Sequence, residues 1–468
     1  MDLINVQLAN CMEWVPTLSR ASGPLYRQIS DAIERDVANG ALRRGQQMPT
    51  HRALAVALGI DLTTVTRAYS DARHRGLLDA RVGQGTFVSE STKRAMLDVP
   101  DSVRIDLSMN VPPQPVEAAL DARIERGLAS IHKRYGLSSF LNYQEPGGSE
   151  PDRLVVAAWL KRRLPDVPTG RIVIYPGSQS AIFNILLAHL KPGDTLLTEA
   201  LTFPGVKAAA ESLGIRLVGV PVDEQGVVPA ALAKALDATK SKAVYLTPTM
   251  HNPTTATMGK ARRREVAEVL RRSNAFLIED DAYGALDPMQ QLLAALIPEK
   301  TFLTISLSKC LAPALRVSFL VTPDALSALN LRSKLRATSQ MVAPLMNALV
   351  IEWLRSGEAE QIITAIRTEA AGRQQLAARV LKGHAFAAHP KGHHLWLPLP
   401  ARWNRADFVV ELSRQSLAVV GSEAFAVDQP RSPHAVRLCL GAARNRAELG
   451  SALELLFKTL GREAAHVV

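Results

Sequence analysis

A lysine that follows an apolar strand could do covalent chemistry with a carbonyl group. The segment SLSKCLAPALR places Lys309 beside Ser306 and Ser308, with Arg316 seven residues later. Burial and a nearby cation lower the pKa of a lysine amine, so that it can attack an aldehyde. The two serine hydroxyls and Arg316 are groups that bind phosphate, the arginine in bidentate fashion. An isolated lysine is usually a solvated surface charge, and the strand and the flanking hydroxyls argue against that alternative here.

A carboxylate and a phenol follow the run AFLIEDDAYG. Asp280 ends this apolar run, where a buried carboxylate is costly unless it is paired, and Tyr283 comes three residues later. The protonated nitrogen of a pyridine ring is a partner that would justify Asp280, because the negative charge keeps such a ring protonated and electron-withdrawing. Asn252, in PTMHNPTT, is a donor suited to a phenolate oxygen on the same ring, beside Tyr283. The alternative for Asn252 is a simple turn before Pro253.

Two segments offer groups for a phosphate and for a flat ring. PGSQSAIFNILLAHL places Gly177, Ser178 and Gln179 just before a predicted helix, whose first amides could hold a phosphate together with the Ser178 hydroxyl. A capped helix with no ligand is the alternative. TEALTFPG places Phe203 after a strand, where its ring could stack on a cofactor or simply pack in the core.

A late arginine sits in the apolar run AVRLCLG. A buried guanidinium needs an anion, and the carboxylate of a substrate would supply one to Arg437. An internal salt bridge is the alternative.

The elements that must position these groups alternate between strand-like and helix-like patterns from about residue 105 onward. Strand-like runs include RIVIYPG, DTLLTEA, RLVGVPV, KAVYLTP, AFLIEDD, TFLTISLS and RVSFLVT. Such alternation predicts a mostly parallel sheet covered by helices. The informative polar residues follow these runs, as expected for a site at the carboxyl ends of the strands.

Taken together, GSQ, HNPT, EDDAY, SLSK and the late arginine resemble fold-type I pyridoxal-phosphate (PLP) enzymes of the aspartate aminotransferase class. The resemblance implies that Lys309 forms the internal aldimine, that Asp280 pairs with the pyridine nitrogen, and that Arg437 clamps a substrate carboxylate. It also implies that Asn252 and Tyr283 contact the ring oxygen and that Phe203 stacks on the ring. The groups implied at or near the phosphate are Gly177, Ser178, Gln179, Ser306, Ser308 and Arg316. The segment YQEPGG is similar to one whose tyrosine, here Tyr143, reaches the phosphate of a partner subunit.

The first ninety residues predict a small helical domain with a hairpin. Residues 24–39 are amphipathic, with apolar residues every four positions. Thr50 can cap a helix over residues 51–58 that Gly59 ends, and Asp61 can cap a second helix over residues 62–75 that Gly76 ends. The gap between these two helices has the length of the turn in a helix-turn-helix. LLDARVGQGTFV then predicts two short strands around residues 83–85, a hairpin wing.

The polar residues of the second helix suit DNA. Thr63, Thr64, Thr66 and Arg67 lie at its N-terminal end, the end that such helices present to the major groove. Arg67 could bind either a phosphate or a guanine. Two further predicted contacts are Arg52, which could hold a backbone phosphate, and Gly85, which would let the wing approach the DNA closely. The alternative is a small helical domain that binds protein.

PLYRQI, RRGQQMPTHRALA, LGIDLTTVTRAY and GQGTFV resemble the winged-helix domain of GntR-family regulators, and the order of the two domains resembles that of the MocR type. The resemblance implies a winged helix-turn-helix (α+β) in residues 1–89 and an α/β three-layer fold-type I domain in 105–468. Within that domain we expect a large subdomain over roughly 150–345 and a small one over roughly 346–468. Residues 90–104 are polar, carry mixed charge and lack an apolar period, which predicts a linker with a short helix near residues 93–97. The chain departs from many members at Thr50, where the capping hydroxyl is kept, and at Phe203, Ala314 and Ser318, where the changes blur any inference about the substrate.

Composition sets limits on these interpretations. The formal net charge is +11 and the pI about 9.7, yet residues 1–90 contain ten Lys and Arg against nine Asp and Glu. The DNA argument therefore depends on the motif rather than on the overall charge. No apolar run is long enough to suggest a membrane helix, and the first residues do not resemble a signal peptide. Cys11, Cys310 and Cys439 match no metal spacing, so we expect a cytoplasmic protein with incidental thiols and no metal site.

Three hypotheses remain for the whole chain. The first is a regulator that binds double-stranded DNA as a head-to-tail homodimer and senses PLP, or a small amino compound joined to it. The second is a working aminotransferase with an accessory DNA-binding domain, and the third is a regulator whose large domain serves only to dimerise. The winged-helix signature argues against the second as the main role, whereas intact Lys309, Asp280 and Arg437 argue against the third. Residual transamination is compatible with the first.

Overall fold

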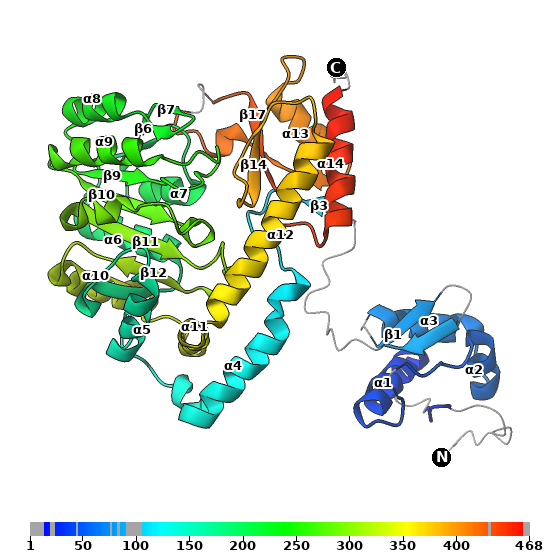
Figure 1. Ribbon diagram of the computed structural model, residues 1–468. Coiled ribbons are helices and arrows are strands. Elements are labelled where there is room, and N and C mark those ends of the chain that lie inside the picture. The colour runs from blue at the N-terminus through cyan, green and yellow to red at the C-terminus, as the bar shows by residue number, and fades with distance from the viewer. Residues whose placement is uncertain are drawn as a thin grey trace. The chain divides into compact units, whose positions relative to one another are not determined.

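The computed structural model describes residues 14–18, 24–43, 45–74, 77–81, 85–89, 105–428 and 432–461. The contacts divide the chain into two compact units, Met1–Ser102 and Val103–Val468 (Figure 1). The expected short helix near residues 93–97 and the tip of the wing at residues 82–84 lie outside the described residues. No helix among the residues that the structure describes is long and apolar enough to cross a membrane.

The small unit has a helix-turn-helix followed by an antiparallel hairpin. Its elements are α1 (Leu25–Ala38), α2 (His51–Leu58), α3 (Leu62–His74), β1 (Leu78–Arg81) and β2 (Gly85–Val88). Thr50 caps α2, because its hydroxyl accepts a hydrogen bond from the amide of Ala53 (3.2 Å). Gly59 ends the helix in the left-handed conformation (φ 62°), which a residue without a Cβ adopts at little cost. Ile29, Ile33, Leu54 and Val65 are fully buried where the three helices meet.

The large unit is built on a seven-stranded sheet in the order β4-β12-β11-β10-β9-β5-β6. Only β12 runs antiparallel to its neighbours, so the predicted α/β sheet is confirmed as mostly parallel. The strands are β4 (Ile172–Tyr175), β5 (Thr195–Glu199), β6 (Arg216–Val220), β9 (Ala243–Leu246), β10 (Phe276–Asp281), β11 (Thr301–Ser306) and β12 (Ser318–Val321).

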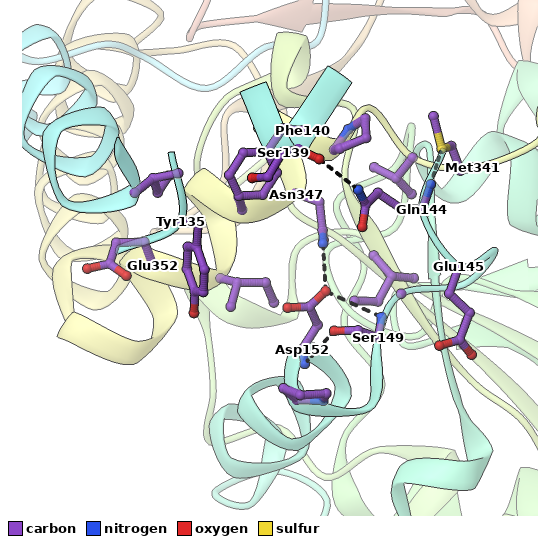
Figure 2. Close-up of a pocket in the computed structure, with 18 of the residues that line it drawn as sticks. Tyr135, Ser139, Phe140, Gln144, Glu145, Ser149, Asp152, Met341, Asn347 and Glu352 are labelled. Atoms are coloured by element: carbon purple, nitrogen blue, oxygen red, sulfur yellow. Dashed lines mark hydrogen bonds between the residues drawn. The ribbon is translucent and has the colours of Figure 1, made fainter. Parts of the chain in front are cut away.

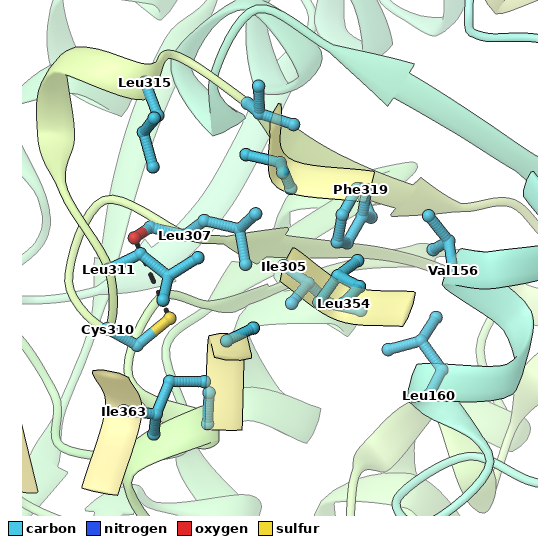
Figure 3. Packing of buried hydrophobic residues seen from close by; sticks show 14 of the residues in the cluster. Val156, Leu160, Ile305, Leu307, Cys310, Leu311, Leu315, Phe319, Leu354 and Ile363 are labelled. Atoms are coloured by element: carbon cyan, nitrogen blue, oxygen red, sulfur yellow. Dashed lines mark hydrogen bonds between the residues drawn. The ribbon is translucent and has the colours of Figure 1, made fainter. Parts of the chain in front are cut away.

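Helices cover both faces of this sheet, which gives three layers. Val173, Ile278 and Phe302 point to one face and pack in one buried cluster. Ile305 and Phe319 point to the other face and pack in a second cluster with α5 and α11 (Figure 3). The helices of these layers are α5 (Glu150–Leu160), α6 (Ser178–His189), α7 (Pro204–Ser212), α8 (Pro229–Thr239), α9 (Lys260–Arg271), α10 (Ala325–Ser339) and α11 (Pro344–Ser356).

A second, smaller sheet of the large unit has the order β13-β14-β17-β16 and its own core. The long helix α12 (Glu358–Val380) joins the two parts: Ile362 and Ile366 pack in the core with α11, whereas Ala377 packs with the smaller sheet. The elements here are β13 (Ala387–Ala388), β14 (His394–Pro398), β16 (Val420–Gly421), β17 (Ala435–Cys439), α13 (Arg405–Arg414) and α14 (Arg446–Gly461). The division near residue 346 stays a prediction; this residue lies within α11, which packs against α4 and α5.

The remaining elements connect these layers. They are β3 (Ile105–Asp106), which pairs in parallel with β15 (Leu417–Ala418), the hairpin β7 (Val222–Asp223) and β8 (Gly226–Val227), and helix α4 (Leu120–Tyr135). Short 3-10 helices are η1 (Val116–Ala118), η2 (Leu137–Leu141), η3 (Thr169–Arg171), η4 (Gly284–Leu286), η5 (Leu293–Ala295), η6 (Pro298–Lys300), η7 (Pro313–Leu315) and η8 (Ser422–Ala424).

We expect Thr50→Ala to destabilise α2 by about 1 kcal/mol, because the amide of Ala53 loses its acceptor. Local opening of α2 should then be about fivefold more frequent. Hydrogen–deuterium exchange of the α2 amides in the full chain measures this opening. Thr50→Ser keeps the capping hydroxyl and should exchange like the parent protein. Equal protection in the alanine variant would show that the cap does not limit opening.

Candidate functional site

Lys309 lies in the loop after β11, and apolar neighbours hold that loop in place. Leu307, Cys310 and Leu311 are completely buried in the core between β11 and α12 (Figure 3). The Nζ atom of Lys309 donates a hydrogen bond to the backbone oxygen of Asn110 (2.5 Å). Burial lowers the pKa of the Lys309 amine, and the positive charge of Arg437 acts in the same direction. The loop therefore presents an amine that loses its proton more readily than an ordinary lysine.

Asp280, near the end of β10, is 4% exposed and is held by two neighbouring strands. Its Oδ2 accepts a hydrogen bond from the hydroxyl of Tyr245 on β9 (2.7 Å), and its Oδ1 accepts one from Thr304 on β11 (3.0 Å). Burial raises the pKa of Asp280, and both hydrogen bonds act in the opposite direction. The site thus holds a carboxyl group whose charge is costly and whose position is fixed from both sides.

Arg437, on β17, reaches the predicted Asn252. Its Nη1 donates to Asn252 Oδ1 (2.8 Å) and its Nη2 to the backbone oxygen of Ser108 (2.6 Å). The guanidinium carbon also lies 4.8 Å from the centre of the Phe425 ring. Arg437 is only 6% exposed, and within the described ranges it forms no ion pair, while its buried Nε has no hydrogen-bond partner. The alternative of an internal salt bridge is not seen in this part of the chain.

Tyr283 is buried between Asn110 and a histidine pair. The side-chain amide of Asn110 donates a hydrogen bond to the Tyr283 hydroxyl (2.5 Å), while Asn110 Oδ1 is buried without a partner in the region that the structure describes. Burial raises the pKa of Tyr283, so its hydroxyl keeps its proton at neutral pH. The ring of His394 lies 5.5 Å from that of Tyr283, and His393 Nε2 is 2.6 Å from the backbone oxygen of Lys309.

Two of the groups predicted near the phosphate, Gly177 and Arg316, meet where α6 begins. Gly177 precedes α6 with φ 93°, and a Cβ built on it would lie 2.5 Å from Arg316 Nη2, so the guanidinium lies directly against the Gly177 backbone. Arg316 is exposed and donates to the backbone oxygen of Pro176 (3.2 Å). Ser306 and Ser308 are buried, and the amide of Ser308 donates to the Ser306 hydroxyl (3.3 Å). The first turn of α6 contains no acidic residue to compete with an anion.

Gln179 and Phe203 come together around the start of α7. Gln179 Nε2 donates to the backbone oxygen of Gly205 (2.9 Å), and a Cβ on Gly205 would collide with both Gln179 and Phe203. Gly205 is thus a position where only hydrogen fits between the two side chains. Ser178 is the first residue of α6 and is partly exposed.

Tyr143 does not join this cluster in the single chain. It is 80% exposed, two residues after η2. A separate pocket of about 410 Å³ lies nearby, between α4, α5 and α11, and none of the predicted site residues lines it (Figure 2). Asp152 is held there by hydrogen bonds with Ser149 and with Asn347 Nδ2 (3.0 Å).

Several residues of the cluster were not singled out from the sequence. Tyr245 and Thr304 lie inside runs that have the pattern of apolar strands. A polar residue inside a buried strand was the one feature of the sequence that could have indicated a role in the site. Asn110 and Ser108 precede the first helix of the large unit, and nothing in their local pattern points to a site some 200 residues away. In the small unit, the predicted residues Arg52, Thr63, Thr66 and Arg67 are exposed, Thr64 is half-buried, and Gly85 adopts φ 109°.

Two family models match the chain. The model "Aminotransferase class I and II" matches residues 103–456, and "Bacterial regulatory proteins, gntR family" matches residues 25–88. The vitamin B6 salvage pathway transcriptional repressor PtsJ of Salmonella typhimurium is 30% identical over 94% of the chain and 99% of its own length. The HTH-type transcriptional regulator YdeF of Bacillus subtilis is 29% identical over 96% and 97%, respectively.

Solved structures share the fold of the large unit. The kynurenine aminotransferase of Pyrococcus horikoshii, in complex with PMP, superimposes with a TM-score of 0.70 and 23% identity, over 77% of this chain and 91% of that one. The α-aminoadipate aminotransferase LysN of Thermus thermophilus, complexed with N-(5′-phosphopyridoxyl)-L-leucine, gives a TM-score of 0.70 over 77% and 92%.

We expect Tyr245→Phe to destabilise the large unit by about 1–3 kcal/mol at neutral pH, because the buried Asp280 carboxylate loses a donor. The missing hydrogen bond favoured the ionised form, so the pKa of Asp280 rises further in the variant. The loss should therefore be largest above that pKa and should shrink as the pH falls and the carboxyl becomes protonated. Urea unfolding at neutral and acid pH measures both values.

Tyr175→Phe is the matched control, since the Tyr175 hydroxyl donates to the backbone oxygen of Leu331 (2.9 Å) in the same layer and faces no carboxylate. Its cost should not depend on pH. The same pH dependence in both variants would contradict the role assigned to Tyr245.

Proposed function

The chain belongs to the MocR-type regulators of the GntR family, in which a helix-turn-helix domain precedes an aminotransferase class I and II domain, and we propose that this helix-turn-helix transcription regulator senses an amino compound through PLP held in its large unit. The observation that carries the proposal is the cluster of Lys309 and Asp280, at the carboxyl ends of β11 and β10, with Arg437 of β17 in the smaller sheet. Asp280 and Arg437 are buried and Lys309 is partly buried, all three are hydrogen-bonded, and no carboxylate within the described ranges neutralises Arg437.

The residues present fit a pyridoxal phosphate group. Lys309 would hold its aldehyde carbon covalently, and Asp280 would face the ring nitrogen. Gly177, where a Cβ would clash with Arg316, gives a close approach to the backbone at the start of α6, and we expect the Ser306 and Ser308 hydroxyls to contribute to the same phosphate site. When bound, the group supplies an aldehyde that reacts reversibly with primary amines. The remaining predicted contacts are Ser178 and Gln179 near the phosphate, Phe203 on the ring face, and Asn252 with Tyr283 at the ring oxygen.

Regulation requires that the site be connected to the DNA-binding unit. Ser108 and Asn110 belong to the first described segment of the large unit, which follows directly on the residues that join the two units. The backbone oxygens of these two residues accept hydrogen bonds from Arg437 and Lys309, and the Asn110 side chain bonds Tyr283. A ligand that engages Lys309 and Arg437 would release these contacts. We propose that this segment carries the response, because a ligand shifts an equilibrium only through contacts that differ between two states.

We also propose that two copies pair head to tail, with Tyr143 of each reaching the phosphate site of the other. The support is a group of large apolar side chains within residues 135–143 that are exposed in the single chain: Tyr135, Leu137, Leu141 and Tyr143, whose exposed fractions are 58%, 40%, 86% and 80%. A monomer rarely leaves such a group of large apolar side chains in water. Double-stranded DNA as the partner of the small unit follows from its helix-turn-helix family.

We expect purified protein incubated with PLP to give, after borohydride reduction, one modified peptide that contains Lys309. Lys309→Ala should give no covalent adduct, because no other lysine among the described residues contacts Asp280 or Arg437, while cofactor bound without a covalent bond should still be detectable by equilibrium dialysis. Lys391→Ala, which removes a partly exposed lysine of the same unit, should be modified like the parent protein. An adduct on a different lysine would contradict the proposal.

Arg437→Ala should keep the visible absorbance of bound PLP and lose the change in that absorbance on adding amino acids. The expected loss of affinity is roughly 2–5 kcal/mol for a fully desolvated carboxylate pair. Arg437→Lys keeps the charge without the planar fork and should recover part of the response. The measurement is an absorbance titration with amino acids and, in parallel, with simple amines. A normal amino-acid response in the alanine variant would show that Arg437 is purely structural.

A further inference from the structure

A surface pocket of the small unit lies outside the turn between α2 and α3. It has a volume of about 420 Å³ and is lined by the beginnings of α1 and α3: Leu25, Tyr26, Thr63, Thr64 and Arg67. Two of these residues, Leu25 and Tyr26, precede the helix-turn-helix and were not predicted to contact DNA. The pocket therefore extends the predicted DNA surface onto α1.

Arg67 is held over this pocket by an aromatic ring. Its guanidinium carbon lies 4.1 Å from the centre of the Tyr26 ring. In the part of the chain that the structure describes, the Arg67 side chain has no acidic partner and no hydrogen-bond acceptor. A guanidinium that stacks on a ring by its flat face keeps the N–H groups at its edge free for an oxyanion. Arg67 is thus oriented but not neutralised.

Tyr26 is fixed in turn by a second arginine. Arg27 Nε donates a hydrogen bond to the Tyr26 hydroxyl (3.2 Å), and its guanidinium lies 6.0 Å from the same ring. The ring therefore contacts two cations. This arrangement concentrates positive charge at the start of α1, where the first turn of the helix contains no acidic residue.

The other polar groups of the pocket also favour an anion. The first amides of α1 point out of the helix end and carry partial positive charge, whereas the amide of Thr64 on α3 donates to the backbone oxygen of Asp61 (3.1 Å). The Thr64 hydroxyl forms no hydrogen bond within the described ranges and is free to donate one. The Thr63 hydroxyl, by contrast, donates to Asp61 (2.5 Å), and the Thr66 hydroxyl donates to the backbone oxygen of Leu62 (2.9 Å). Asp61 is the acid beside the pocket, and the amide of Thr63 also donates to it (2.7 Å).

We propose that this pocket holds a phosphate of the DNA backbone and that Arg67 therefore contacts a phosphate and not a base edge, with Tyr26 as its positioning residue. The proposal rests on the function proposed above. It decides between the two roles left open for Arg67 by its sequence position, because the contact with α1 draws the guanidinium toward the start of that helix. The contact would fix the position of the unit on any duplex without reading its sequence.

The test compares binding of the full-length protein to two duplexes over a series of salt concentrations. One duplex is selected by the protein from a random library, and the other is an unrelated duplex of equal length. Arg67→Ala should reduce the slope of log affinity against log salt by about one unit on both duplexes. At 0.1 M salt this corresponds to a loss of affinity of roughly eightfold on each. Tyr26→Ala should weaken binding to both duplexes by the same factor, whereas Tyr26→Phe, which keeps the ring face, should bind within about twofold of the parent.

Arg35→Ala is the matched control, since it removes an equally charged and exposed side chain of α1 that is paired with Asp36 (3.2 Å) and lies outside the pocket. It should change neither slope by a full unit. Circular dichroism checks that each variant keeps its helices. A selective loss of affinity for the selected duplex in Arg67→Ala, with both slopes unchanged, would overturn the proposal in favour of a base contact. Parent-like binding by Tyr26→Ala would overturn the role of Tyr26. If the parent protein itself prefers no duplex, the proposed regulator function fails instead.

Discussion

The large unit depends on burying ionisable groups at the carboxyl ends of its central strands, where a charge is costly unless it is paired or the group is neutral. Asp280 is the clearest case, because its two oxygens are each held by a hydroxyl from a flanking strand. Glu199, at the end of β5, faces His251 at 4.0 Å. Burial raises the pKa of Glu199 to about 8 and lowers that of His251 to about 4, so both are neutral near pH 7. The strand ends thus carry little net charge apart from the groups that a ligand would meet.

Packing then decides which of these groups face a ligand. The loop that follows β11 turns Leu307, Cys310 and Leu311 into the core, and this fixes Lys309 on the opposite side (Figure 3). Arg437 comes from the smaller sheet, whose helix α12 is anchored in both cores. A rearrangement of the smaller sheet would therefore move Arg437 relative to Lys309. Such a movement between the two parts of the large unit is a conformational change that a sensor can couple to ligand binding.

Much of this arrangement could be predicted from the sequence. The strands are recognisable as apolar runs, and few polar residues follow them. The α/β pattern predicted a mostly parallel sheet with a site at the carboxyl ends of its strands, but not the order of the strands in space. What could not be predicted depends on register and on distant contacts. In the sheet register, Thr304 pairs directly with Asp280, and Tyr245 pairs with Ile278, which lies two residues before Asp280 on the same face of β10. The local sequence pattern does not reveal which residues of neighbouring strands are paired. Asn110 reaches Lys309 across 199 residues of chain. In the small unit, the hydroxyls of Thr63 and Thr66 were expected to face DNA, yet both are engaged by groups within α3 or its cap.

The present partners of Arg437 explain why a carboxylate would have a large effect there. Asn252 Oδ1 and the backbone oxygen of Ser108 are both neutral acceptors, and the Nε atom has none in the described part of the chain. A carboxylate offers a charge-assisted, bidentate contact in a buried site, where it is stronger than a contact with a neutral oxygen. The gain comes only if the Ser108 contact is exchanged, since the same N–H group cannot serve both acceptors equally well. The free energy available to move the Ser108–Asn110 segment is therefore the difference between the hydrogen bonds of Arg437 with the carboxylate and those with its present acceptors. A ligand that bound tightly but left the Ser108 contact intact would not move the segment.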